Sequence, residues 1–174
     1  MPKKKIGVAV IGSGSIATFR HAPEYAANPS AQLIAFVDRV PERAERLAQK
    51  YGATALTNWE EALALPGVDA VSVCTPNVLH APMTIAALRA GKHVLCEKPM
   101  ATSDKEARDM IAASEKAGKF LMIGHNQRLA ALHVKARQLV ETGMVGKIIS
   151  FRTAFAHPGP EGWSIEGATG WFFD

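Results

Sequence analysis

The hydrophobic positions of this chain form short unbroken runs, and segments with a helical repeat separate them. The first run, residues 6–11 (IGVAVI), does not alternate, which is typical of a strand buried on both faces of a parallel sheet. Similar runs occupy residues 33–37, 70–74, 93–96 and 120–123. Between them, apolar residues recur at helical spacing, as at 44, 47, 48 and 51 and again at 107, 110 and 111. This alternation predicts an α/β fold with a doubly wound parallel sheet.

The residues expected at helix ends agree with this interpretation. Gly52, Gly91 and Gly118 each follow a helical segment, where a left-handed residue commonly ends a helix. Ser103 and Glu106 have the spacing of a capping box, and Pro41 suits the first turn of a helix.

The pattern changes after Ile123. A helix is expected over 129–141 and a strand over 147–155, and the remaining residues are rich in glycine, proline and aromatic side chains. We therefore expect a dinucleotide-binding domain at 1–124, and at 125–174 a linker helix and the truncated start of an α+β domain. A strand at 147–155 would have no later partner, so we expect this end of the chain to self-associate or to be partly disordered.

Composition and charge exclude several classes of function. The 174 residues carry 20 Lys and Arg against 16 Asp and Glu, a formal charge of +4 that is too mild and too dispersed for nucleic-acid binding. No segment has the length of a membrane span or the form of a signal peptide, so we expect a cytoplasmic protein with Cys74 and Cys96 reduced. The six histidines lack metal-ligand spacing, and no metal is expected.

A glycine-rich loop follows the first predicted strand and opens a helix. It reads Gly12-Ser13-Gly14-Ser15-Ile16-Ala17. In this context the first glycine allows a tight turn, the second lets the backbone approach a pyrophosphate, and the small residue at 17 allows close helix packing. The free amides at the start of the helix favour an anion. We therefore predict a bound dinucleotide.

Asp38 and Arg39 bear on the choice of dinucleotide. Asp38 ends the second predicted strand, about where an acidic residue binds the adenosine ribose in such folds. Its carboxylate would repel a 2′-phosphate, which favours NAD. The Arg39 guanidinium could instead pair with that phosphate, so NADP remains an alternative.

Two further segments end strands at the same edge of the predicted sheet. Thr75-Pro76-Asn77-Val78-Leu79-His80 follows the fourth strand, and Gly91-Lys92-His93-Val94-Leu95-Cys96-Glu97-Lys98-Pro99 contains the fifth. With the glycine loop, these segments resemble the glucose-fructose oxidoreductase and inositol dehydrogenase family (Gfo/Idh/MocA). The resemblance covers essentially the whole chain, and Glu-Lys-Pro is its most specific element. It implies a Rossmann-like fold, and an NAD(P)-dependent oxidoreductase that acts on sugar- or polyol-like hydroxyl groups.

The resemblance also implies roles for individual residues. Lys98 would lie beside the nicotinamide and the substrate hydroxyl as the catalytic residue, and an amine can take the hydroxyl proton where burial disfavours its charged form. Pro99 would help to aim Lys98, and a cis Lys98–Pro99 bond is one hypothesis for this tight turn. Glu97 would orient Lys98 or bind the ribose. The other residues expected to contact the cofactor are Thr75, Pro76, Asn77, His80 and Asn126; for His80, a role in packing or capping is the alternative.

Some expected parts are absent from the sequence. Enzymes of this family have a second α+β domain that mediates oligomerisation, and an Asp-x-Gly-x-His segment whose side chains assist the lysine. No such segment occurs here, so the chain resembles the cofactor-binding part, and a homo-oligomer is expected of the complete protein. His157 and Trp163 are open candidates for substrate contacts. The alternative functions are a dinucleotide-binding regulator or sensor without catalysis and a nucleotide-dependent methyltransferase.

Overall fold

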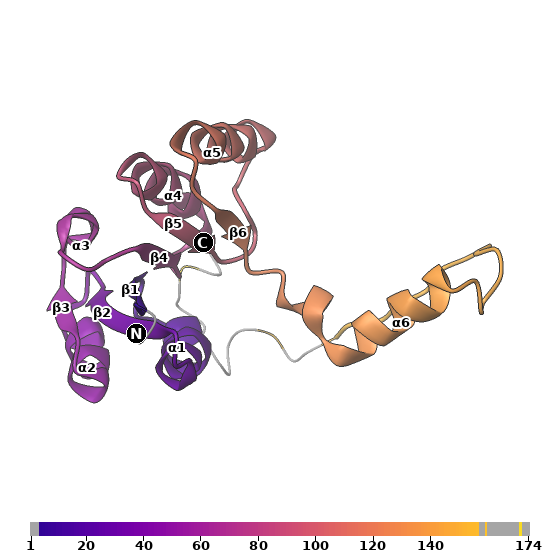
Figure 1. Ribbon diagram of the computed structural model, residues 1–174, viewed down its shortest axis with the longest axis horizontal. Helices are drawn as coiled ribbons and strands as arrows, with labels where there is room; N and C mark the ends of the chain where they lie inside the picture. Colours follow the sequence, from indigo (N-terminus) through magenta and orange to yellow (C-terminus); the bar gives the residue numbers. More distant parts are fainter. Residues whose placement is uncertain (1–3, 157–158, 160–170, 172–174) are drawn as a thin grey trace.

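A six-stranded parallel sheet forms the centre of the molecule. The computed structural model describes residues 4–156, 159 and 171. The strands are β1 (Ile6–Ile11), β2 (Ala31–Val37), β3 (Thr54–Leu56), β4 (Ala70–Val73), β5 (His93–Cys96) and β6 (Leu121–Ile123). Their order, β3-β2-β1-β4-β5-β6, is that of the dinucleotide-binding Rossmann fold (Figure 1). The predicted fold class is confirmed.

Helices connect consecutive strands. A π-helical turn (Ala17–His21) runs into α1 (Ala22–Ala27), and α2 (Pro41–Tyr51), α3 (Trp59–Ala64), α4 (His80–Arg89) and α5 (Asp104–Ala117) follow in turn. Short 3-10 turns span Asn77–Leu79 and Asn126–Leu129, and α6 covers Ala131–Glu141. α6 extends away from the sheet (Figure 1).

The side chains of β1 alternate between two hydrophobic cores, as a buried parallel strand requires. Val8 and Val10 belong to the core that α1 and α2 cover, whereas Ala9 and Ile11 belong to the core under α3, α4 and α5. Cys74 and Cys96 are free, buried cysteines that belong to different cores.

The helix ends follow the predicted local signals. Gly52 and Gly118 end α2 and α5 in the left-handed conformation, and Gly91 follows α4 with φ 77°. Ser103 accepts a hydrogen bond from the Glu106 amide. The Glu106 carboxylate also accepts hydrogen bonds from the Thr102 amide and hydroxyl.

Two elements were not predicted from the sequence, and one predicted strand is wrong. β3 and α3 are short and carry weak periodicity. Residues 147–155 form no strand and pair with no described strand, although Ile149 and Phe151 have high β propensity. Ile149 is instead 95% exposed. His157 and Trp163 lie outside the described residues.

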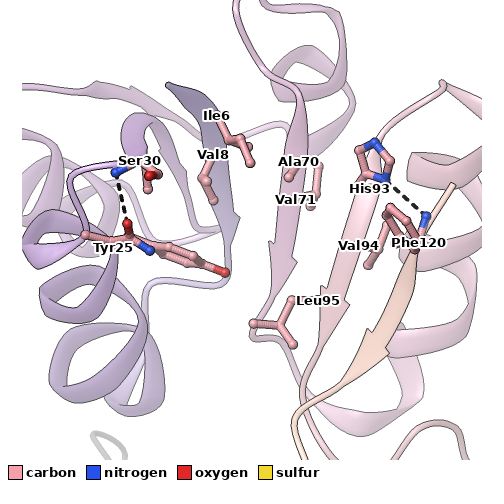
Figure 2. A pocket seen from close by; sticks show the side chains of 12 residues that line it. Ile6, Val8, Tyr25, Ser30, Ala70, Val71, His93, Val94, Leu95 and Phe120 are labelled. Atoms are coloured by element: carbon pink, nitrogen blue, oxygen red, sulfur yellow. Dashed lines mark hydrogen bonds between the residues drawn. The ribbon is translucent and has the colours of Figure 1, made fainter. Parts of the chain in front are cut away.

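A hollow lies at the amino ends of the strands, opposite the end at which ligands bind in such sheets. It has a volume of about 250 Å³, and the lining residues include Tyr25 of α1 and Leu95 of β5 (Figure 2). The ring of His93 stacks on Phe120 and its Nδ1 accepts a hydrogen bond from the Phe120 amide. Phe120 itself is 80% exposed. None of the helices in the described residues is both long and apolar enough to span a membrane.

Candidate cofactor and active site

A pocket of about 740 Å³ lies at the carboxyl ends of the strands. It includes the point between β1 and β4 where the strand order reverses, which is the usual ligand site of an open α/β sheet. Most of the predicted site residues line it: Gly12, Gly14, Ser15, Ile16, Asp38, Arg39, Thr75, Pro76, Asn77, His80, Glu97 and Lys98. The strand ends thus bring together segments that are distant in the sequence.

The two glycines of the loop are required for different reasons. Gly12 has φ 92°, and a Cβ there would lie 2.5 Å from the carbonyl oxygen of Cys74, so the fold itself requires glycine. Gly14 lacks a positive φ, and a Cβ there would meet no protein atom within 4 Å. Neither backbone conformation nor packing therefore requires glycine at position 14. The free space beside it suits a ligand that approaches the backbone.

Replacing Gly14 by valine should block cofactor binding without harming the fold. The added side chain would occupy the space left for the pyrophosphate, and a misfit of about 1–3 kcal/mol weakens binding by about 5-fold to 150-fold. Titration with NADH and NADPH, beside a thermal unfolding curve, tests this. The smaller Gly14→Ala change serves as the graded control and should have an intermediate effect. Undiminished binding by Gly14→Val would place the pyrophosphate elsewhere.

The Asp38 side chain is hydrogen-bonded to the glycine loop. One carboxylate oxygen accepts a hydrogen bond from the Ser13 amide and the other from the Val40 amide, each at 2.9 Å. The Ser13 hydroxyl donates to the Val37 carbonyl oxygen, and the residue is fully buried. Ser13 was predicted to contact the cofactor, but its amide and hydroxyl are engaged with the protein and it does not line the pocket. Asp38 does reach the pocket, where its remaining lone pairs could accept from a ribose.

The loop after β4 offers a polar atom that suits a ligand. The hydroxyl oxygen of Thr75 is buried and has no hydrogen-bond partner among the described residues. A buried hydroxyl without a partner is unfavourable, so a bound polar group would satisfy it. This hydroxyl and the open space at Gly14 both fit a dinucleotide laid across the strand ends.

His80 ties two loops of the pocket together. It is 1% exposed; Nδ1 lies 2.7 Å from the Pro99 carbonyl oxygen and Nε2 lies 2.9 Å from that of Thr75. Both ring nitrogens are therefore engaged with backbone, which leaves neither for the cofactor. The packing alternative describes the observed contacts of His80.

The Glu97-Lys98-Pro99 segment leaves β5 at the floor of the pocket. The Lys98–Pro99 peptide bond is cis, as hypothesised, and the Lys98 side chain is exposed. Asn126 starts the 3-10 turn after β6, is exposed, and does not line the pocket. The expected contact between Asn126 and a cofactor therefore has no counterpart in the geometry.

A buried histidine beneath this segment was missed at the sequence level. His21 Nε2 lies 2.8 Å from a carboxylate oxygen of Glu97, and the two side chains are 8% and 15% exposed. Burial opposes the charge on His21, but the hydrogen bonds and charges of Cys74 and Glu97 outweigh it and raise its pKa to about 10. Glu97 is the partner in direct contact, and we take it as the main cause.

The charge on Glu97 is stabilised in return. Burial acts to raise the pKa of this carboxyl, yet the hydrogen bond and charge of His21 hold that pKa below its ordinary value. The pair is therefore an imidazolium and a carboxylate near neutral pH. No described group of His, Cys, Asp or Glu side chains forms a cluster that could hold a metal ion.

Fold and pocket together are those of a dinucleotide-binding domain. Residues 6–125 match the family model GFO_IDH_MocA, whose description is an oxidoreductase family with an NAD-binding Rossmann fold. The chain belongs to this family, which confirms the resemblance and the prediction of an NAD(P) cofactor.

Curated relatives include dehydrogenases and reductases. The chain is 35% identical to D-glucoside 3-dehydrogenase of Escherichia coli over 167 residues, which are 95% of this chain and 48% of that protein. It is 38% identical to 1,5-anhydro-D-fructose reductase of Ensifer adhaerens over 139 residues, covering 78% of this chain and 42% of that protein. The chain therefore spans about half the length of these curated relatives.

A solved structure is similar in fold. A 3-ketoreductase from Actinomadura kijaniata in complex with NADP superposes with a TM-score of 0.78 at 34% identity, covering 83% of this chain and 46% of that one. That protein was crystallised with NADP, whereas the description of the family model mentions NAD.

Proposed function

We propose that the protein containing this chain is an NAD(P)-dependent oxidoreductase of sugar- or polyol-like hydroxyl groups. The present chain would bind the cofactor and contribute Lys98 as the catalytic acid and base. The proposal rests chiefly on one observation: Lys98 and the glycine loop line the same pocket, one on each side of the point where the strand order reverses. A lysine in this place would reach the reacting end of a cofactor whose phosphates lie at Gly14.

Different residues along the pocket would bind different parts of the cofactor. Asp38 and Arg39 would bind the adenosine ribose, and Gly14 with the following helix start would hold the pyrophosphate. The Thr75 hydroxyl would donate to or accept from the cofactor further along. A bound nicotinamide would supply the acceptor or donor of a hydride.

Lys98 would take the proton from the substrate hydroxyl during oxidation and return it during reduction. The Lys98 side chain is exposed to solvent. Bound cofactor and substrate would bury it, and burial favours the neutral amine that can accept a proton. The chain's own contribution is to place the amine. The proton acceptor thus becomes effective only in the loaded site.

The named reactions of the relatives support the substrate class. Those relatives include enzymes described as acting on a glucoside, an anhydro sugar and inositol. All three offer a secondary hydroxyl or its ketone on a ring. The residues that distinguish one substrate from another would lie largely outside the described pocket, since the relatives are about twice as long as this chain.

The first test of the proposed function is to titrate the 174-residue chain with NADH and NADPH. Calorimetry and cofactor fluorescence measure the binding. Saturable binding of either cofactor supports the proposal. Absence of binding to both, in a chain shown to be folded by circular dichroism, contradicts it. The protein that contains this chain is then assayed for oxidation of glucosides and inositols with each oxidised cofactor, and a sensor without catalysis would bind but not turn over.

Arg39 should decide how well NADPH competes with NADH. The Arg39 side chain is exposed at the edge of the pocket beside Asp38, where a 2′-phosphate would lie. A charge-assisted hydrogen bond contributes about 1.5–3 kcal/mol, so Arg39→Ala should weaken NADPH by about 10-fold to 100-fold. Affinity for NADH, measured in the same titrations, should change little.

The control variant for this experiment is Arg89→Ala, which removes a charge at the end of α4, outside the pocket. It should alter neither affinity. If Arg39→Ala lost affinity for NADH and NADPH equally, Arg39 would maintain the shape of the pocket and would not bind the 2′-phosphate.

A further inference from the structure

His21 and Glu97 form a buried ion pair directly below the lysine of the pocket. His21 comes from the helical turn after β1 and Glu97 directly follows β5, so the pair joins two separate elements of the site. A buried charge is costly unless it is paired and hydrogen-bonded. A pair in this place is therefore expected to serve more than stability.

The second ring nitrogen of His21 is also engaged. Nδ1 lies 2.7 Å from the hydroxyl oxygen of Ser72, a fully buried residue of β4, and the Tyr25 hydroxyl donates to the same oxygen at 3.3 Å. The Cys74 thiol, which also faces this cluster, donates to the same oxygen at 3.9 Å. Glu97 lies at Nε2 and Ser72 at Nδ1, so both ring nitrogens are engaged with the protein, whichever partner donates in the Ser72 contact. The orientation of the ring is fixed from both sides.

The Glu97 carboxylate transmits this constraint to the lysine. One oxygen accepts from His21 and the other accepts from the backbone amide of Lys98 at 3.2 Å. Gly124, at the end of β6, lies against the same carboxylate, since a Cβ there would be 3.2 Å from it. The carboxylate is therefore enclosed between His21, Gly124 and the start of the Lys98 backbone.

We propose that His21 is a positioning residue for Lys98, acting through Glu97. By keeping the Glu97 carboxylate ionised and in place, it fixes the turn from which Lys98 extends to the substrate. This inference rests on the proposed function, because it assumes that Lys98 exchanges the substrate proton. Its first consequence, however, concerns the Glu97–Lys98 turn itself and can be measured without turnover.

Removal of the imidazolium should change both the charge and the geometry at Glu97. In His21→Gln the carboxylate keeps a hydrogen-bond donor of similar reach but loses its counter-ion. Glu97 should then take up a proton at higher pH than in the wild type. Lys98 would lose its fixed starting point, and a misplacement of about 1 Å can cost about 100-fold in rate.

The first experiment follows Glu97 and Lys98 by nuclear magnetic resonance in the 174-residue chain. The side-chain carboxyl carbon of Glu97 and the amide of Lys98 are recorded during a pH titration of the wild type and of His21→Gln. We expect the Glu97 midpoint to rise by about one unit or more in the variant, and the Lys98 amide to shift with the same midpoint. An unchanged midpoint and an unchanged Lys98 amide would overturn the proposal.

The pH dependence of the unfolding free energy is an independent test of the His21–Glu97 ion pair. The raised pKa of His21 stabilises the fold fully below the ordinary value of 6.5, and this contribution is lost as the pH rises towards about 10. The lowered pKa of Glu97 stabilises the fold above its ordinary value and is lost in acid. The difference in unfolding free energy between wild type and His21→Gln should therefore be largest at mildly acidic pH and shrink towards pH 10.

The second experiment measures turnover in the protein that contains this chain. His21→Gln should lower kcat by about 10-fold to 100-fold, with little change in KM for the cofactor, and should move the acid limb of the kcat profile to higher pH. The matched control is His93→Gln, which removes a histidine hydrogen bond at the amino end of the sheet. Glu97→Gln should reproduce the effect of His21→Gln, and the double variant should be no worse than either.

The outcomes separate the two proposals. If the wild type binds neither NADH nor NADPH, the proposed function fails, while the titration of Glu97 still reports whether His21 controls this turn. If the wild type turns over but His21→Gln loses kcat only in proportion to lost folded protein, as His93→Gln would, His21 is merely structural and the inference is overturned.

Discussion

Replacing Lys98 by alanine should lower turnover in the protein that contains this chain by about 100-fold to 10,000-fold, the usual contribution of a positioned acid or base. Affinity for NADH or NADPH should change far less, because the glycine loop and Asp38 remain intact. The expected loss appears in kcat, which steady-state rates measure, whereas cofactor titration reports binding separately.

The Lys98→Arg variant distinguishes the two roles that a lysine can have here. Arginine keeps the positive charge but does not release its proton near neutral pH. A proton-exchanging Lys98 therefore predicts that the arginine variant is nearly as inactive as the alanine variant. Substantial activity in Lys98→Arg would show that only the charge is needed, and full activity in Lys98→Ala would remove Lys98 from the mechanism.

Replacing Gly12 by alanine should cost about 3 kcal/mol or more in the free energy of unfolding. A side chain at a φ of 92° is strained by about 1–3 kcal/mol, and the new Cβ would lie only 2.5 Å from the Cys74 carbonyl oxygen, which belongs to the backbone and cannot easily yield. Urea unfolding followed by circular dichroism measures the change.

The comparison with Gly14→Ala makes the Gly12 experiment specific. Both changes add one methyl group to the same loop, but a Cβ at Gly14 meets open space. Gly14→Ala should therefore leave the urea midpoint nearly unchanged. Equal midpoints for the two variants would show that the loop can move away from β4.

The sheet was predictable because its strands carry their own signal. The bounds of β1 and β5 were predicted as they are observed, since buried parallel strands form continuous apolar runs. β3, with three residues, and α3, with six, are too short for periodicity to show. At 147–155 the side chains suit a strand, but β structure depends on pairing, and this segment pairs with no described strand.

The candidate site residues that belong to local sequence motifs could be predicted from the sequence. The glycine loop and Asp38 were predicted from their places after strands and Lys98 from the family resemblance, and all of them line the pocket. Ser13 and His80 occur in the same motifs, yet the Ser13 hydroxyl and both ring nitrogens of His80 bind the protein's own backbone, and these tertiary contacts leave no local sequence signal. His21 was missed because its partner lies 76 residues away, and no local spacing connects them.

The double role of Asp38 limits how cofactor preference could be engineered. A common strategy would replace the acidic residue at the ribose end with a small or basic one to admit NADP. In this chain the same carboxylate holds the amides of Ser13 and Val40, so that substitution would also release the phosphate loop from β2. Selectivity and loop order are coupled at position 38. Arg39, whose side chain is exposed beside it, is the position at which preference can be redesigned with the loop left in place.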